Sequence, residues 1–188
     1  MELNQADRAW CKEVNQKIKD KMAWVSEKSR YKIPYTTVNG VHDDRADKAV
    51  DWRPDDGLNW WTNGFWGGMM WQMYYETGEE RYAEIARYSE QLLDQCFEDY
   101  YGLQHDVGFM WLPTAVADYR ITKNPQSRKR GMHAANLLAG RLHPSGKFIR
   151  AWNDIPDGQP TLGWAIIDCM FNIPLLYWAG EESGDPRF

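Results

Sequence analysis

The sequence contains little cysteine. Only Cys11, Cys96 and Cys169 occur among 188 residues, and they are far apart and odd in number. No C-x-x-C pair and no Cys/His ligand spacing is present, which argues against a disulfide framework and against a zinc site. We therefore expect reduced thiols that pack as small apolar side chains, and no bound metal.

A long apolar run is also missing. The most apolar stretch, residues 164–179, contains Asp168, Asn172 and Pro174. It is shorter than the roughly 20 apolar residues that a membrane-spanning helix needs. The first eight residues hold no apolar core of a signal peptide. These two absences predict a protein with no membrane partner and a cytoplasmic location.

Positive charge is not in excess. The net charge is -5 and the isoelectric point is near 5.4. Binding of nucleic-acid phosphates needs clustered cations, so a nucleic-acid partner is not expected. Aromatic residues are abundant instead, because 11 Trp, 10 Tyr and 6 Phe make up 14% of the chain. Trp suits protein cores and also the apolar faces of sugar rings.

Helical periodicity dominates the chain, with apolar residues three or four positions apart. No strand pattern competes with it, and residues 148–152 form at best a short extended piece. A polar loop is expected over residues 29–58, and Pro174 is expected to kink the last helix. The pattern predicts helices over residues 3–25, 64–76, 80–97, 109–121, 125–141 and 162–179.

An internal repeat organises these helices. Gly64-Phe65 and Gly108-Phe109 each open a helix that is apolar almost all round, and an amphipathic helix follows each of them. A third copy begins near Asp168. Helices that are apolar on all sides are expected to be buried. The unit is therefore a buried helix, a turn and an outer helix, and rings of such hairpins form α/α barrels.

A closed ring of six hairpins needs roughly 300 to 370 residues at this repeat length. We therefore expect an all-α fold in which residues 1–188 are the N-terminal part of a single (α/α)6 six-hairpin barrel, truncated before the barrel closes. A half-ring that dimerises is the alternative. Inner helices left exposed in a half-ring predict possible self-association, because monomers rarely expose large apolar patches.

Two carboxylates are the candidates for chemistry. Asp106 stands at the start of one inner helix, and Asp168 stands among apolar residues near the start of another. Parallel inner helices would place both at the same end of the ring. Burial should raise the pKa of Asp168, which would let it donate a proton near neutral pH. The structural alternatives are a helix N-cap for Asp106 and a hydrogen-bonded loop anchor for Asp168.

Aromatic and basic residues near the same end are candidates for substrate binding. Trp60 and Trp61 precede the first inner helix, where one of them could stack on a sugar ring and the other could pack in the core. Arg150 and Trp152 lie on the long loop before residue 162. Arg150 could meet a substrate carboxylate or could be an ordinary surface arginine.

These segments together resemble the unsaturated glucuronyl hydrolases of glycoside hydrolase family 88. The resemblance covers about residues 59–188, and its most specific parts are the second and the fourth segment. It rests on WTNGFWGG at 61–68, HDVGFM at 105–110, IRAW at 149–152 and IDCMFNIPLL at 167–176.

The resemblance implies a six-hairpin α/α barrel that releases a terminal 4,5-unsaturated uronic acid from lyase-generated oligosaccharides. In this family water adds across the C4–C5 double bond, and the resulting hemiketal opens. Asp168 matches the catalytic acid and base, and Asp106 matches the second active-site aspartate. His105, Trp60, Trp61, Arg150 and Trp152 are expected to contact the substrate, an unsaturated oligosaccharide. The family needs no metal or organic cofactor.

Three other functions remain open. An unsaturated rhamnogalacturonyl hydrolase of family 105 would share the barrel and the chemistry, although the segment from His105 to Met110 favours family 88. The chain could also be an inactive carbohydrate-binding fragment that uses stacking Trp residues. An α/α-barrel sugar epimerase would need catalytic His residues at the ends of inner helices, where only His105 is found.

Overall fold

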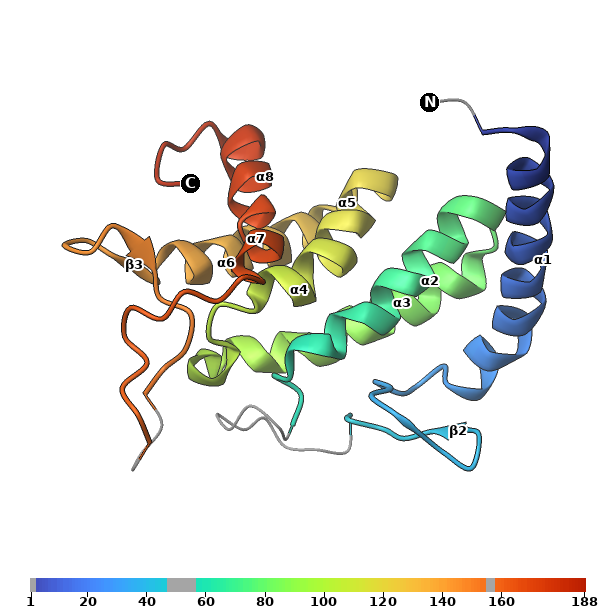
Figure 1. Ribbon diagram of the computed structural model, residues 1–188, viewed down its shortest axis with the longest axis horizontal. Coiled ribbons are helices and arrows are strands. Elements are labelled where there is room, and N and C mark those ends of the chain that lie inside the picture. The colour runs from blue at the N-terminus through green and yellow to red at the C-terminus, as the bar shows by residue number, and fades with distance from the viewer. Residues whose placement is uncertain (1–2, 47–56, 155–157) are drawn as a thin grey trace.

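The computed structural model describes residues 3–46, 57–154 and 158–188, and it is mainly helical (Figure 1). Short 3-10 turns precede or extend several α-helices. Within these ranges the strands form two small antiparallel hairpins, β1 with β2 and β3 with β4. The α-helices are α1 (Gln5–Lys28), α2 (Gly64–Thr77), α3 (Glu80–Leu93), α4 (Val107–Trp111), α5 (Ala117–Thr122), α6 (Pro125–Ala139), α7 (Cys169–Asn172) and α8 (Pro174–Ser183). The other elements are β1 (Thr37–Val38), β2 (Val41–His42), β3 (Leu142–His143), β4 (Phe148–Ile149), η1 (Trp61–Asn63), η2 (Asp94–Phe97), η3 (Tyr100–Leu103) and the π-helical turn η4 (Leu112–Val116).

The first helical hairpin joins α2 to α3, as the repeat predicts. Gly78 ends α2 with a φ of 72°, a left-handed conformation that glycine adopts without steric cost. Trp66 and Met70 of α2 pack against Tyr82 and Ile85 of α3, and all four are buried. The prediction that α2 is buried on all sides is wrong. Its remaining face is open to solvent over a row of apolar side chains, Phe65, Met69 and Tyr75.

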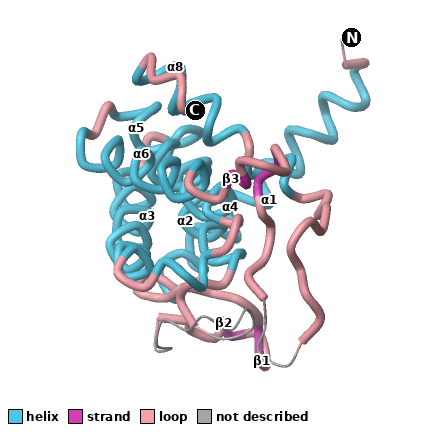
Figure 2. Tube along the Cα trace, turned by 90° about the vertical axis from the view of Figure 1, so that its left-hand side faces the viewer, coloured by secondary structure: helices cyan, strands magenta, loops and turns pink. Residues whose placement is uncertain are grey.

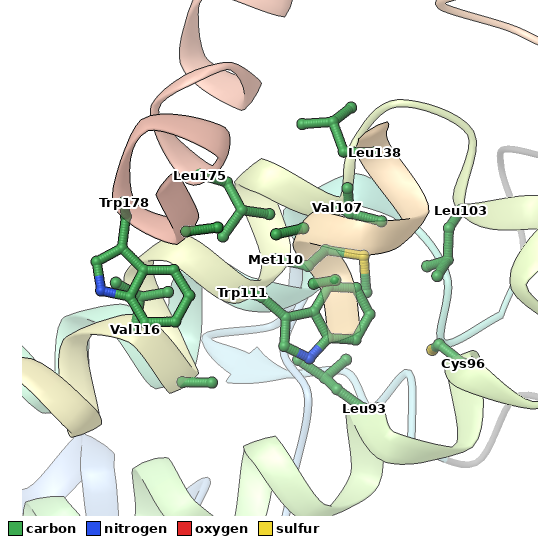
Figure 3. Close-up of a cluster of buried hydrophobic side chains, with 14 of the residues drawn as sticks. Leu93, Cys96, Leu103, Val107, Met110, Trp111, Val116, Leu138, Leu175 and Trp178 are labelled. Atoms are coloured by element: carbon green, nitrogen blue, oxygen red, sulfur yellow. The ribbon is translucent and has the colours of Figure 1, made fainter. Parts of the chain in front are cut away.

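The second hairpin joins α4, η4 and α5 to α6. Pro113 lies in η4 and cannot donate a backbone hydrogen bond, which agrees with the local widening to a π-turn. Trp111 and Leu138 are fully buried where α4 meets α6 (Figure 3). Leu175 and Trp178 extend the same core to α8, so one apolar cluster spans the second and third repeats.

The third repeat departs from prediction at its start. Residues 162–168 form two short turns joined by residues without regular structure, and the helix begins only at Cys169. Gly163, with a φ of 86°, favours this turn. Pro174 was expected to kink a continuous helix, but it occupies the first turn of α8, where its missing N–H costs no hydrogen bond.

Helix α1 forms as predicted, but its apolar stripe is largely uncovered. Trp10 is 64% exposed and Trp24 is 51% exposed, while Met22 and Val25 contact the α2–α3 cluster. The helix stands at the end of the molecule beside the first hairpin (Figures 1 and 2). Within the described residues, no helix is long and apolar enough to cross a membrane.

The two glycines of the repeat explain how the inner helices meet. A Cβ atom at Gly64 would lie 2.5 Å from the Cα atom of Met110, and one at Gly108 would lie 2.3 Å from the Cα atom of Asn172. Only glycine permits backbones to approach this closely. Each inner helix thus contacts the next through its first turn, which brings the residues before α2, α4 and α7 to one end of the molecule.

Candidate active site

Asp106 and Asp168 occupy equivalent positions at the starts of α4 and α7. Each is the N-cap residue of its helix by position, yet neither side chain accepts a capping hydrogen bond. The structural alternative considered for Asp106, a capping role, is therefore not realised. Both carboxylates remain available for other interactions, and the close contact at Gly108 holds them on the same side of the structure.

His105 lies between the two carboxylates. Its Nε2 atom is 3.4 Å from Asp106 Oδ1 and 3.4 Å from Asp168 Oδ1, and its side chain is completely buried. Within the described part of the chain, neither ring nitrogen makes a hydrogen bond. Gln104 adopts a φ of 53°, which is uncommon for a residue other than glycine, and the backbone N–H of His105 donates to Ala151. These constraints hold the imidazole in place against the two aspartates.

Burial differs between the two aspartates. The side chain of Asp106 is 14% exposed, whereas that of Asp168 is 39% exposed. Asp168 Oδ1 is itself buried, so the exposed part of this side chain lies in its other atoms. The apolar surroundings expected for Asp168 are absent, because its neighbours Ile167 and Met170 are 91% and 72% exposed.

The electrostatics follow from this difference in burial. Burial, and next the nearby charge of Asp168, raise the pKa of Asp106 to about 7. A hydrogen bond with Asn172 and the charge of Arg141 act in the opposite direction. Burial also lowers the pKa of His105, so its imidazole is neutral at physiological pH. The raised pKa lets Asp106 hold a proton near neutral pH.

Asn172 connects the two carboxylate-bearing turns. It is fully buried, and its Oδ1 atom accepts a hydrogen bond of 2.9 Å from the backbone N–H of Phe109. Phe109 stacks on Phe171 with ring centroids 4.6 Å apart, and Phe65 meets Phe109 edge-on at 5.9 Å. The inner helices therefore contribute one aromatic ring each to a contiguous cluster beside the aspartates.

The two candidate tryptophans face different partners. Trp61 contacts Phe109 at 5.1 Å between ring centroids, which joins it to the aromatic cluster beside the aspartates. Trp60 meets Tyr35 edge-on at 6.1 Å. Tyr35 borders a hollow of about 440 Å³ between the β1–β2 hairpin and α2, with Thr62 and Trp66 also in its wall. Both tryptophans are half-buried, so part of each ring surface is accessible.

Arg150 and Trp152 lie on the loop that follows β4. The guanidinium of Arg150 donates to the carbonyl of Trp152 and forms an ion pair of 2.9 Å with Asp154. Trp152 packs against Trp164 at 5.9 Å. Their loop reaches the aspartates through Ala151, whose carbonyl accepts from the backbone of His105. Neither the Arg150 nor the Trp152 side chain has a described contact with Asp106 or Asp168.

One ligand atom from each of His105, Asp106 and Asp168 lies within 4.8 Å of the other two. A neutral imidazole and two carboxylates are donors that a divalent cation accepts. The same three groups can exchange protons without any cation. The arrangement is therefore compatible with acid–base chemistry through its own side chains.

Comparisons with known proteins identify relatives of this chain. The unsaturated glucuronyl hydrolase of Bacillus sp. (strain GL1) is 38% identical over 130 residues, which cover 68% of this chain and 34% of that protein. The unsaturated chondroitin disaccharide hydrolase of Streptococcus pyogenes serotype M1 is 36% identical over 129 residues, with 68% and 32% covered. This chain is homologous to the unsaturated glucuronyl hydrolases. No protein-family model matches it.

A solved structure supports the same relationship. The structure is that of an aspartate-to-asparagine variant of an unsaturated glucuronyl hydrolase, and its name includes the oligosaccharide dGlcA-Glc-Rha-Glc. It superposes on this chain with a TM-score of 0.69 at 31% sequence identity. The match covers 86% of this chain and 40% of that structure. The predicted α/α-barrel fold is confirmed by this match and by the helical structure. The chain spans about a third of the length of the curated relatives that it matches.

Sequence reasoning missed two residues of this unsaturated glucuronyl hydrolase homologue. Arg141 lies beyond the end of α6. Its positive charge adds to the lowering of the pKa of His105 and partly offsets the raised pKa of Asp106. Nothing in its sequence context distinguishes it from a surface arginine. Asn172 follows Asp168 by four residues. A polar amide within an otherwise apolar helical segment is the sequence signal that could have revealed its structural role.

Proposed function

We propose that this chain carries the acid–base groups of a glycoside hydrolase that removes 4,5-unsaturated uronic acids from the non-reducing ends of oligosaccharides. The observation that carries the proposal is the convergence of Asp106 and Asp168 on buried His105, at 3.4 Å each. The homologous hydrolases support the substrate class, since their names specify unsaturated glucuronyl and chondroitin substrates.

In the proposed reaction one molecule of water adds across the C4–C5 double bond. Asp168 gives a proton to C4, and its carboxylate then takes a proton from the water whose oxygen bonds to C5. The hemiketal formed at C5 opens, and the adjoining sugar leaves. Asp168 is assigned this role because it is the more exposed of the two carboxyl groups and can touch substrate. The reaction requires proton transfer alone, without a metal or an organic cofactor.

Asp106 serves as the proton reserve of the pair. Two carboxylates this close titrate as a unit, and the raised pKa of Asp106, about 7, lets the pair keep one proton near neutral pH that either carboxyl group can hold. Its negative charge, when formed, would favour protonation of Asp168. His105 is too buried to reach a sugar, so we assign it a positioning role that differs from the substrate contact expected from sequence.

The substrate-binding assignments follow the accessible surfaces. Trp61 is the proposed stacking platform, since it connects through Phe109 to the turn that carries Asp106. Trp60 extends the aromatic surface toward Tyr35. Arg150 and Trp152 would contribute to substrate binding through their loop, and a uronate carboxylate would have to compete with Asp154 for Arg150.

The deciding experiment follows the ultraviolet absorbance of the conjugated enol ether in unsaturated chondroitin, hyaluronan and heparin disaccharides. The 188-residue chain and the longest product of the same gene are tested in parallel. Loss of absorbance with wild-type protein, and not with Asp168→Asn, supports the proposal. Saturable binding without any loss of absorbance in either protein would identify a carbohydrate-binding protein and would overturn it.

A further inference from the structure

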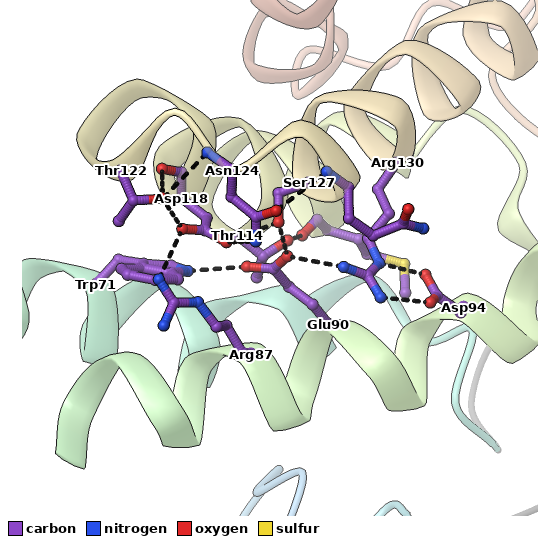
Figure 4. A network of polar contacts seen from close by, with 12 residues as sticks. Trp71, Arg87, Glu90, Asp94, Thr114, Asp118, Thr122, Asn124, Ser127 and Arg130 are labelled. Atoms are coloured by element: carbon purple, nitrogen blue, oxygen red, sulfur yellow. Dashed lines mark hydrogen bonds and ion pairs between the residues drawn. The ribbon is translucent and has the colours of Figure 1, made fainter. Parts of the chain in front are cut away.

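A second pair of acidic residues is buried where the first helical hairpin meets the second (Figure 4). Glu90 of α3 and Asp118 of α5 both have side chains with no exposed surface. Ser127 of α6 lies between them and is also fully buried. Buried carboxyl groups are costly unless they are neutral or fully hydrogen-bonded, so their protonation decides how well this interface holds.

Ser127 contacts two carboxyl groups, but the hydrogen of its own hydroxyl can serve only one of these contacts. Ser127 Oγ is 2.7 Å from Glu90 Oε2 and also 2.7 Å from Asp118 Oδ2. A hydroxyl group has one hydrogen and can donate to only one of these oxygens. The second contact has hydrogen-bond length, so a carboxylic acid must donate to Ser127 across it.

Hydrogen-bond donors around the pair indicate which carboxyl group is the acid. Asp118 accepts from Thr122 Oγ1 at 2.6 Å and from Asn124 Nδ2 at 2.8 Å, so three donors including Ser127 satisfy it as a carboxylate. Glu90 receives one neutral donor, Trp71 Nε1, at 3.0 Å on Oε1. Its Oε2 atom is left free to carry the hydrogen that Ser127 accepts.

The charged groups that face the pair agree with this assignment. Arg87 lies 3.5 Å from Asp118 and supports its negative charge. Arg130 lies 3.5 Å from Glu90, but it is committed to a bidentate pair with Asp94 at 2.7 Å for each contact. Among described residues α2 contributes only the neutral indole of Trp71. Burial raises the pKa of Glu90 to about 7, ahead of a smaller effect from Asp118.

We propose that Glu90, Ser127 and Asp118 form a structural proton-binding site, in which a hydrogen on Glu90 completes a hydrogen-bond chain that ties the first hairpin to the second. Above the pH at which this hydrogen leaves, two buried carboxylates face one hydroxyl, and the interface weakens. The site is independent of the proposed catalytic function, because none of its three residues belongs to the candidate active site.

The sign of the effect follows from the direction of the pKa shift. Glu90 holds a proton in the folded state at pH values where the unfolded chain has released it. The site therefore stabilises the fold fully at low pH, and this stabilisation is lost as the pH rises through about 7. Within that window the unfolding equilibrium constant increases by up to about tenfold per pH unit.

Glu90→Gln tests the site, because a glutamine amide is neutral at every pH and can donate to Ser127 in place of the acid. Denaturant unfolding of wild-type and variant chains is compared at pH 5 and pH 8. We expect similar stability at pH 5, and at pH 8 an unfolding constant at least about tenfold lower for the variant. The exposed Glu84→Gln on the same helix is the matched control; it removes a surface ion pair with Arg30 and should change the unfolding constant little and equally at both pH values. Other titrating groups, Asp106 included, are present in all these chains and cancel.

Asp118→Asn locates the proton. The NH2 group of an asparagine would face a donor group of Thr122 or Asn124 where an oxygen now accepts. This variant should therefore be destabilised at both pH values. Infrared spectra at pH 6 are recorded in an Asp106→Asn background, because Asp106 would otherwise add an acid band of its own. They should show the carbonyl band of a buried carboxylic acid when Glu90 is present and lose it in Glu90→Gln. If Glu90→Gln is less stable than the wild type at pH 8, or if the band persists in it, the proposal is wrong.

Discussion

Asn172 accepts a hydrogen bond from the backbone N–H of Phe109, and this one contact links the turn that carries Asp168 to the turn that carries Asp106. Asn172 also lies 3.5 Å from the carbonyl of Asp168. The relative position of the two carboxylates therefore depends on a residue that itself has no part in proton transfer.

Asn172→Ala should destabilise the chain by about 1–3 kcal/mol, because it leaves a buried backbone N–H without an acceptor. Denaturant unfolding measures the change. Asn136→Ala is the matched control, since the exposed Asn136 amide bonds only the carbonyl of Met132 and its removal should cost less than about 0.5 kcal/mol. Equal losses in the two variants would contradict the linking role of Asn172.

Asp168→Asn should lower turnover at least about a hundredfold, while substrate binding and melting temperature stay nearly unchanged. The substitution preserves size but removes the titrating proton. Turnover is measured by ultraviolet absorbance on whichever form of the protein is active. A variant with more than about a tenth of wild-type turnover would show that Asp168 is not the acid, and Asp106 would become the residue to test.

The pH dependence of the site should follow Asp106. Its folded-state pKa of about 7 lies above its unfolded value of about 4, so the folded state holds a proton through this interval. Its contribution to stability is present at low pH and is lost as the pH rises to about 7, by up to about 1.4 kcal/mol per pH unit. Turnover should decline over the same upper part of this range.

Asp106→Asn checks this dependence, because its side chain is neutral throughout. Relative to the wild type, the variant should have a similar melting temperature at pH 5 and a higher one at pH 8. A wild-type profile that Asp106→Asn leaves unchanged would assign the titration to another group. The Glu90 site is intact in both proteins and does not affect the difference.

The exposed apolar surface predicts self-association. Met69 of α2 is 45% exposed, Phe171 of α7 is 44% exposed and Tyr177 of α8 is 68% exposed. Surfaces of this kind favour contact with another apolar face. Light scattering should show a mass that increases with concentration, and Ile167→Glu with Met170→Glu should reduce it. A single monomer mass across the concentration range would exclude the prediction.

Much of the fold was predictable because strong periodicity fixes helices locally. The helices at 64–76 and 125–141 form within a few residues of prediction. The stretch 162–168 was mispredicted because its apolar residues imitate a helix, whereas Gly163 and contacts remote in sequence set a turn. The burial of α2 was overestimated, because composition reveals that a face is apolar but not what covers it.

The site was predictable as a set of residues and not as an electrostatic arrangement. The equivalent positions of Asp106 and Asp168 follow from the repeat. The apolar sequence neighbours of Asp168 suggested burial, yet Ile167 and Met170 point outward. Burial raises the pKa of Asp106 to about 7, a shift that its sequence neighbours do not indicate. Arg141 was missed for the same reason.

The backbone contact at Gly108 limits which amino-acid substitutions this protein can tolerate. Where side chains meet, new rotamers can absorb a substitution, but at Gly108 a backbone meets a backbone. Any larger residue would push α4 away from α7 and separate Asp106 from Asp168. Under the proposed function, changes in sugar specificity are therefore expected in the segments before α2 and α7, while the spacing of the two carboxylates stays constant among sequence variants.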